Sequence, residues 1–203
     1  MPPARVEVPH TDFRHRCDRH VDLLQGITVL DPPLQRLLAE LIMVRLFEEF
    51  QDALSGIASR LLRGASYVDG TAPQLLVPAA KSSRAAVTLM TSHGRSRPAQ
   101  LKWSKASFIN DNLGKVMHAA DAFRATVSGQ AVVINEMRIV RNRIAHSNPN
   151  VRQEYARVVR AHYGARRNNI SPGTLLLTQR FVPCMLRRYI ISCRAVVKDC
   201  SRS

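Results

Sequence analysis

The chain has 203 residues, 45% of them hydrophobic, which is enough for a globular domain with a substantial core and excludes a wholly disordered protein. Thirty lysines and arginines against fifteen acidic residues give a net charge of +15. This surplus predicts attraction to polyanions, nucleic acid first, and then an anionic membrane surface or an acidic protein. Because aromatic residues make up only 5%, we expect contacts to phosphate rather than stacking of bases.

Helical periodicity of apolar residues runs through most of the chain, and no segment alternates as a strand does. We therefore predict an all-α bundle, with a basic N-terminal extension or helix at residues 1–30 and a helical domain at residues 31–203. In the longest helix Asp31 is the expected N-cap, Gly64 closes the end, and Gly56 either divides the helix or marks a close contact. The helices are expected at about 11–25, 31–64, 74–92, 104–129, 130–146, 151–163 and 174–199.

Proline turns and arginine-rich loops are expected to separate helices after residue 92. The sequence S-N-P-N at 147–150 is expected to end one helix, because Asn-Pro is a turn signal, and Asn150 to cap the next. Pro183 is expected to kink the last helix. Arginine-rich loops are expected at 92–98 and 160–173. For each, contact with the backbone of a bound RNA and an ordinary solvated loop are equally good interpretations.

Cysteine and histidine usage gives no sign of a disulfide or metal framework. Cys184 and Cys193 lie at helical spacing with Met185 near the C-terminus, and we expect them to fill the core. The N-terminal segment offers His10, His15, Cys17 and His20 in no standard zinc spacing, so contact with RNA or a partner is the preferred interpretation. The chain contains no long uncharged apolar run and begins without an apolar signal region. We therefore expect a soluble, cytoplasmic protein that contacts no membrane.

The segment 138–146, R-I-V-R-N-R-I-A-H, carries the clearest chemical signal. At about 100° per residue, Arg138, Asn142 and His146 follow one another on the side opposite the apolar face, and Arg141 lies between the two sides. His146 is therefore predicted outside the core, either as a solvated surface histidine or as a functional group. The apolar face is formed by Val133, Met137, Val140 and Ile144.

These residue types suit RNA cleavage without a metal. Histidine moves protons near neutral pH, and arginine holds a phosphate and stabilises the charge that develops on it. Asparagine can orient a 2′-hydroxyl or a phosphate oxygen. In such a reaction the 2′-hydroxyl attacks the adjacent phosphate, which leaves a 2′,3′-cyclic phosphate and a 5′-hydroxyl.

The six residues Arg141-Asn142-Arg143-Ile144-Ala145-His146 resemble the R-N-x-x-x-H signature of the HEPN superfamily of helical nucleotide-binding domains. The segment 37–61 resembles the family's long first core helix, with Glu48 or Glu49 at its acidic position. The resemblance extends over about residues 33–200, although only the six-residue motif is specific. It implies a bundle of four or five core helices, here with additional N-terminal and C-terminal helices.

The resemblance also implies roles and partners. Arg141 would bind and stabilise the scissile phosphate, His146 would act as general acid or base, and Asn142 would position the nucleophile or the histidine. Such domains dimerise through the motif-bearing helices, need no metal or cofactor, and cleave RNA, in some cases tRNA, in toxin–antitoxin or antiviral systems. An acidic antitoxin or regulatory protein is then an expected partner.

Further residues are assigned to substrate binding as expectations: Arg138, Arg143 and Glu48. The alternative for each is an ordinary solvated side chain, and Glu48 or Glu49 could instead orient the motif. Asn148 stands where some HEPN toxins carry a tyrosine, so regulation through that tyrosine is not expected here.

Two other classes of function compete with the nuclease. The first is a non-catalytic, basic helical subunit that binds RNA or serves as a scaffold in a larger complex. The second, a DNA-binding regulator, is weaker, because the long predicted helices do not suggest a helix-turn-helix with a recognition helix.

Overall fold

The computed structural model describes residues 5–92, 101–165, 167 and 169–202. Within these residues the chain forms nine α-helices, one 3-10 helix at Ile27–Val29 and no strand, which confirms the all-α class. The described helices are α1 (Glu7–Gly26), α2 (Pro32–Leu61), α3 (Ser83–Ser92), α4 (Ala106–Leu113), α5 (Ala122–Gly129), α6 (Ala131–Ala145), α7 (Pro149–Tyr163), α8 (Pro172–Leu176) and α9 (Met185–Ser201).

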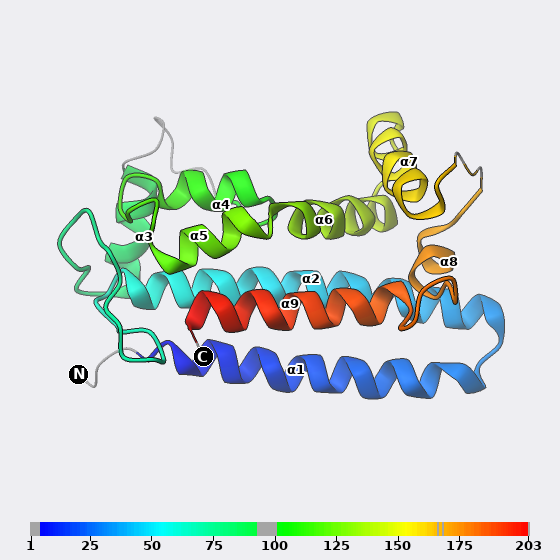
Figure 1. Ribbon diagram of the computed structural model, residues 1–203, viewed down its shortest axis with the longest axis horizontal. Helices are drawn as coiled ribbons and strands as arrows, with labels where there is room; N and C mark the ends of the chain where they lie inside the picture. The colour runs from blue at the N-terminus through cyan, green and yellow to red at the C-terminus, as the bar shows by residue number, and fades with distance from the viewer. Residues whose placement is uncertain (1–4, 93–100, 166, 168, 203) are drawn as a thin grey trace.

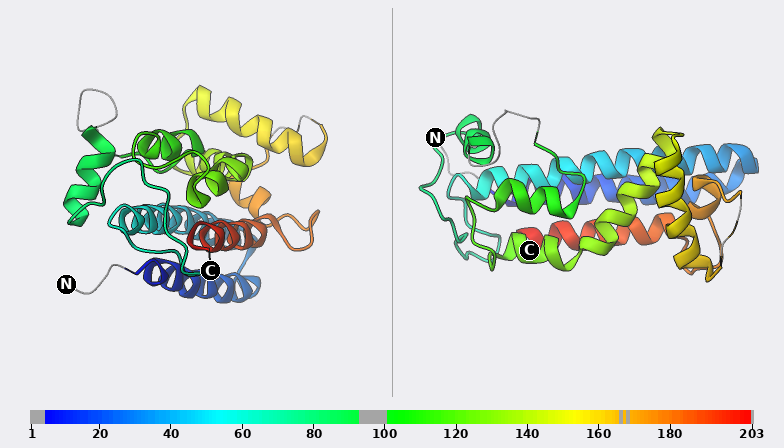
Figure 2. Two further views of the ribbon diagram at one scale, coloured as in Figure 1. Left: turned by 60° about the vertical axis from the view of Figure 1, so that its left-hand side comes forward. Right: turned by 90° about the horizontal axis from the view of Figure 1, so that it is seen from above.

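Three long helices, α1, α2 and α9, run side by side along the length of the molecule (Figure 1). Helices α4, α5 and α6 lie over α2 and α9 on the side opposite α1, and α6 contacts both α2 and α9. Helix α7 crosses α6 at one end of the molecule, whereas α3 lies at the other end (Figure 2). None of the described helices is long and apolar enough to cross a membrane.

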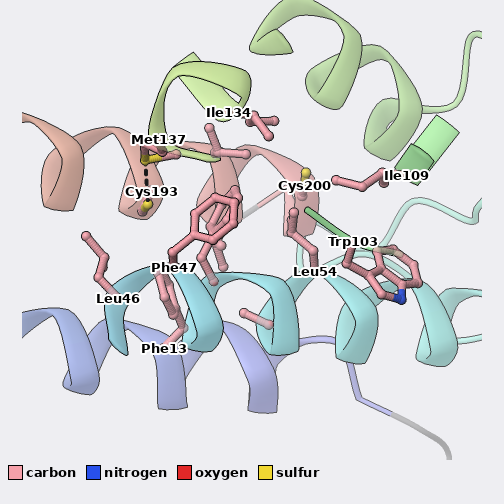
Figure 3. Close-up of a cluster of buried hydrophobic side chains, with 14 of the residues drawn as sticks. Phe13, Leu46, Phe47, Leu54, Trp103, Ile109, Ile134, Met137, Cys193 and Cys200 are labelled. Atoms are coloured by element: carbon pink, nitrogen blue, oxygen red, sulfur yellow. Dashed lines mark hydrogen bonds between the residues drawn. The ribbon is translucent and has the colours of Figure 1, made fainter. Parts of the chain in front are cut away.

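The core fills both sides of α2 and α9, toward α6 on one side and toward the N-terminal helix α1 on the other (Figure 3). Phe13 of α1 and Phe50 of α2 pack with their ring centroids 6.2 Å apart. The Cys193 thiol of α9 lies 3.3 Å from the Met137 sulfur of α6. Cys193 and Met185 are buried in the core, and Cys184 is half-buried against it. Both cysteines are free thiols. Helix α1 therefore belongs to the same core as α2 and α9.

The ends of α2 follow the local sequence signals. The Asp31 carboxylate accepts a hydrogen bond from the backbone N–H of Leu34 at 3.0 Å and caps the helix, as predicted. Gly64, just beyond the end, has a φ of 80°, which favours glycine. The helix continues through Gly56, where an added Cβ would lie 3.3 Å from the Cβ of Pro9. Gly56 thus marks a close contact with α1 rather than a division.

Two of the predicted helices are shorter than expected because tertiary contacts replace helical hydrogen bonds. The segment expected to be helical at 74–92 is helical only from Ser83, since the N–H of Leu76 bonds to the carbonyl of Val116 at 3.0 Å. The helix expected at 104–129 is divided into α4 and α5. Asp121 lies at this division, where its buried carboxylate accepts hydrogen bonds from the Tyr67 hydroxyl and from the N–H groups of Phe123 and Gln74.

The remaining corrections concern two helix starts and the predicted kink at Pro183. Helix α1 begins at Glu7, four residues before the expected cap at Thr11. Helix α7 is capped by Asn148 rather than Asn150, because Pro149 fits the first helical turn, where no N–H is needed. Pro183 does not kink a continuous helix but lies between α8 and α9. Residues 93–98 of the expected basic loop lie outside the described residues.

Candidate functional site

Helix α6 carries the motif and is anchored by its apolar face. Ile134, Met137 and Val140 are completely buried, and Ile144 is partly buried against the core. The helix ends at Ala145, after which the chain turns extended at His146. The sequence prediction of a core-facing stripe on this helix is therefore confirmed, with Ile134 more deeply buried than the expected Val133.

Arg141 points from α6 toward α2. Its Nη2 atom lies 3.8 Å from Oε1 of Glu48, and the side chains are 28% and 43% exposed. The Nε of Arg141 is buried and has no hydrogen-bond partner in the described part of the chain. An ion pair this long and this exposed contributes about 1 kcal/mol or less. The terminal Nη nitrogens of the guanidinium, rather than the buried Nε, therefore keep donors free for an anion.

His146 lies just beyond the C-terminal end of α6 and is exposed. Its backbone N–H donates to the carbonyl of Asn142 at 2.8 Å, and its own carbonyl accepts from Arg143 Nη1 at 3.3 Å. These bonds fix the backbone at the helix end while leaving the imidazole open to solvent. The side-chain amide of Asn142 makes no hydrogen bond to any described residue and is also available.

Arg141 and His146 do not meet within one chain. Five residues of helix separate side chains by about 140° around the axis and about 7.5 Å along it. Arg141 accordingly faces Glu48 on α2, whereas His146 lies past the helix end. No hydrogen bond joins the two side chains among the described residues.

Helix α7 covers part of the α6 face that was expected to be open. The Arg138 guanidinium donates to Glu154 of α7 at 3.3 Å, and its side chain is only 19% exposed. Arg138 is therefore held by an acid and does not extend a free phosphate-binding surface. This packing could not be read from α6 alone, because it depends on the direction in which the chain leaves the S-N-P-N turn.

The two acidic candidates of α2 are separated by the structure. Glu48 lies beside Arg141, whereas Glu49 accepts a hydrogen bond from the buried His20 of α1 at 2.8 Å. Of the two, Glu48 alone can thus influence the motif.

Within the part of the chain that the structure describes, no three His, Cys, Asp or Glu residues are grouped as metal ligands. Burial, the largest influence, raises the pKa of Cys17 to about 12.

A polar network that the sequence did not reveal ties three helices together near the motif. One oxygen of Glu136 on α6 accepts hydrogen bonds from Tyr189 of α9 at 2.6 Å and from His162 of α7 at 2.9 Å. The His162 ring also meets Phe181 edge-on, with centroids 5.5 Å apart. The three polar residues are separated by 26 and 53 positions, so no local pattern could have identified the network.

The outward face of α2 is apolar near its N-terminal end. Leu34, Leu37 and Leu41 are 49%, 53% and 54% exposed. At about 100° per residue they fall within an arc of about 60°, opposite the buried side of the helix, and Glu48 lies within the same arc. The three exposed leucines therefore share one face of α2 with Glu48, and the exposed Arg45 stands between Leu41 and Glu48.

Comparisons of this chain with protein-family models, with curated proteins and with solved structures found no match. The resemblance of the six-residue motif to the HEPN signature thus stays a prediction, whereas the all-α architecture is shown. Chemically, the site offers a half-exposed guanidinium, an exposed imidazole and a free amide at one helix end.

Proposed function

We propose that this protein is a HEPN-type, metal-independent endoribonuclease. The observation that supports it best is Arg141, whose guanidinium lies at a long 3.8 Å from its acidic neighbour Glu48, close to the helix end that also exposes His146. In the proposed reaction Arg141 binds the scissile phosphate, and Asn142 orients the nucleophile. Glu48 holds the guanidinium until an RNA phosphate displaces it.

The proposed reaction balances without a metal. A neutral His146 takes the proton of the 2′-hydroxyl as the 2′-oxygen forms a bond to phosphorus. The bond from phosphorus to the 5′-oxygen breaks, and a protonated His146 of a second chain supplies the proton to the leaving oxygen. The products are a 2′,3′-cyclic phosphate and a 5′-hydroxyl, and Arg141 stabilises the charge on the phosphoryl oxygens.

A second copy of the chain completes this proposed site. Within one chain Arg141 and His146 face different directions, so a composite cleft needs two motif-bearing helices. The leucine stripe Leu34, Leu37 and Leu41 supports association next to Glu48, because exposed apolar side chains in a row on one helix face gain free energy when they are covered.

The cleavage test uses purified protein with total RNA and tRNA in EDTA. We expect wild-type protein to leave cyclic-phosphate ends, and His146→Ala and Arg141→Gln to slow cleavage by about 100-fold or more. Lys81→Gln/Arg84→Gln, a matched loss of two exposed cations near α3, should cleave at the wild-type rate. Equal cleavage by all preparations would trace the activity to a contaminant and contradict the proposal.

The dimer is tested by light scattering. Leu37→Glu/Leu41→Glu should convert the dimer to a monomer and abolish cleavage, whereas Val8→Glu/Leu23→Glu, at equally exposed apolar positions of α1, should leave a dimer. A wild-type monomer that cleaves RNA would contradict the composite site. In cells, a toxin or defence effector should inhibit growth on expression unless an acidic partner is present, and His146→Ala should relieve the inhibition.

A second function, a non-catalytic RNA-binding or scaffold subunit, is favoured by one observation, the separation of Arg141 from His146 within the chain. In that case RNA stays intact, and wild type, Arg141→Gln and His146→Ala all bind it tightly. The same assay therefore decides between the two functions.

A further inference from the structure

Helix α7 presents a hollow on the side that faces away from α6. Its buried residues, Tyr155, Val158 and Val159, form the opposite side of the helix. At the centre of the hollow is the small Ala156. Positions −4, −3 and +4 from it are its neighbours on the helix surface, and Arg157 at +1 borders the hollow from the side. The hollow is lined by Arg152, Gln153, Ala156, Arg157 and Arg160.

The hollow contains three cations and no anion. Arg157 and Arg160 are exposed, and their side chains make no hydrogen bond or ion pair with any described residue. Arg152 donates through Nε to the carbonyl of Ser147 at 2.8 Å, which leaves its terminal nitrogens free. Glu154, the only acid of α7, lies on another side and binds Arg138.

The chemistry of this surface selects among the partners that a basic protein attracts. A second copy of α7 would place like charges opposite one another, which costs free energy. A membrane-binding helix needs an apolar face toward the lipid, and the outward side of α7 offers only alanine between its polar residues. Arginine forks suit phosphate oxygens, and Arg152 to Arg160 cover about 12 Å along the helix, which is room for more than one phosphate of a strand.

We infer that the outward face of α7 is a docking surface for the sugar–phosphate backbone of a nucleic-acid strand. Its position links it to the motif, because Ser147, whose carbonyl Arg152 binds, directly follows His146. That the strand is the substrate rests on the proposed function. Binding itself does not require cleavage, so the two can be tested apart. Helix α7 then holds the strand beside the exposed imidazole.

The test measures binding in the His146→Ala background, where the proposed cleavage is blocked. A fluorescent single-stranded RNA of 12 nucleotides is titrated at several salt concentrations with the parent protein and with Arg157→Gln/Arg160→Gln. Removing two phosphate contacts should make the slope of log K against log salt less steep by about 1.4. If the parent and the double variant bind equally well when extrapolated to 1 M salt, this difference makes the variant bind about 25-fold more weakly at 0.1 M salt. Circular dichroism should show unchanged folding, since both side chains are exposed.

The matched control is Lys81→Gln/Arg84→Gln, which removes the same charge at the opposite end of the molecule (Figure 1). We expect it to change RNA binding by less than about 3-fold. Equal weakening by both double variants, or no weakening by Arg157→Gln/Arg160→Gln, would overturn the inference.

Three further probes test the chemistry of the partner. Single-stranded DNA of the same length should show the same loss as RNA, because the contact is to phosphate. An acidic peptide or anionic phosphatidylserine vesicles that lose more affinity than RNA would instead assign the surface to protein or lipid. If wild-type protein leaves RNA intact while the α7 variant still loses binding, the ribonuclease proposal fails and the docking surface stands.

Discussion

Replacing Glu136 with glutamine should lower the free energy of unfolding by about 1–4 kcal/mol at pH 7. The carboxylate oxygen accepts two short hydrogen bonds, from Tyr189 and His162, and its side chain is only 20% exposed. A hydrogen bond to a charged group contributes about 1.5–3 kcal/mol, and one between neutral groups about 1 kcal/mol. Glutamine keeps one acceptor oxygen, so each bond loses about 0.5–2 kcal/mol rather than its whole value.

The effect should depend on pH. Burial is the largest influence on the pKa of Glu136 and raises it, but hydrogen bonds from His162 and Tyr189 and the charge of His162 together outweigh burial, so the pKa is lowered. A carboxyl with a lowered pKa in the folded state stabilises the fold fully above its unfolded value of about 4.5. That contribution is lost as the pH falls through the lower folded value.

Urea titrations between pH 3 and 8, followed by circular dichroism, measure this difference for wild type and Glu136→Gln. Glu154→Gln is the matched control, because the Glu154 carboxylate is 40% exposed and its pair with Arg138 should contribute about 1 kcal/mol or less. The reasoning is refuted if Glu136→Gln costs no more than the control at pH 7, or if its cost is the same at pH 3 as at pH 7.

Three further predictions test packing and burial elsewhere in the fold. Gly173→Ala should cost about 2–3 kcal/mol in a urea titration, because an added Cβ would lie 2.7 Å from the carbonyl oxygen of Arg36; an unchanged midpoint would contradict this contact. Tyr67→Phe removes one of three donors to the buried Asp121 carboxylate and should cost about 1.5–3 kcal/mol by the same assay. Cys184, half-buried, should react with a thiol reagent before the three buried cysteines, and simultaneous reaction of all four in folded protein would refute this ordering.

Local features of the sequence were sufficient for the helices that carry the candidate site. The apolar spacing of α6 and the cap at Asp31 depend on neighbours within one or two turns, so they could be predicted without a partner helix. The exposure of His146 was predicted from its place outside the apolar stripe, although the histidine lies just past the helix end rather than on the helix. The hypothesis of phosphate chemistry likewise needed only the six residues of the motif.

Helix boundaries were predicted less well where backbone groups found distant partners. Residues 74–82 have enough apolar character for a helix, but three of their N–H groups donate to Val116, Asp121 and Leu62, and the carbonyl of Gln74 accepts from the N–H of His118. The carboxylate of Asp121 then starts a new helix in the middle of a segment that reads as continuous. Such competition between local and distant hydrogen bonds is invisible to periodicity.

The sequence by itself therefore determined the all-α class, the core stripe of α6 and the residue types of the motif. Only the tertiary structure decided that Glu48 rather than Glu49 meets Arg141, that α7 covers Arg138, and that Arg157 points outward from the same helix. The physical reason is the range of the interactions. Helical hydrogen bonds and side-chain periodicity act within a few residues, whereas the partner of a charged side chain depends on how whole helices cross, which is set by packing of the entire core.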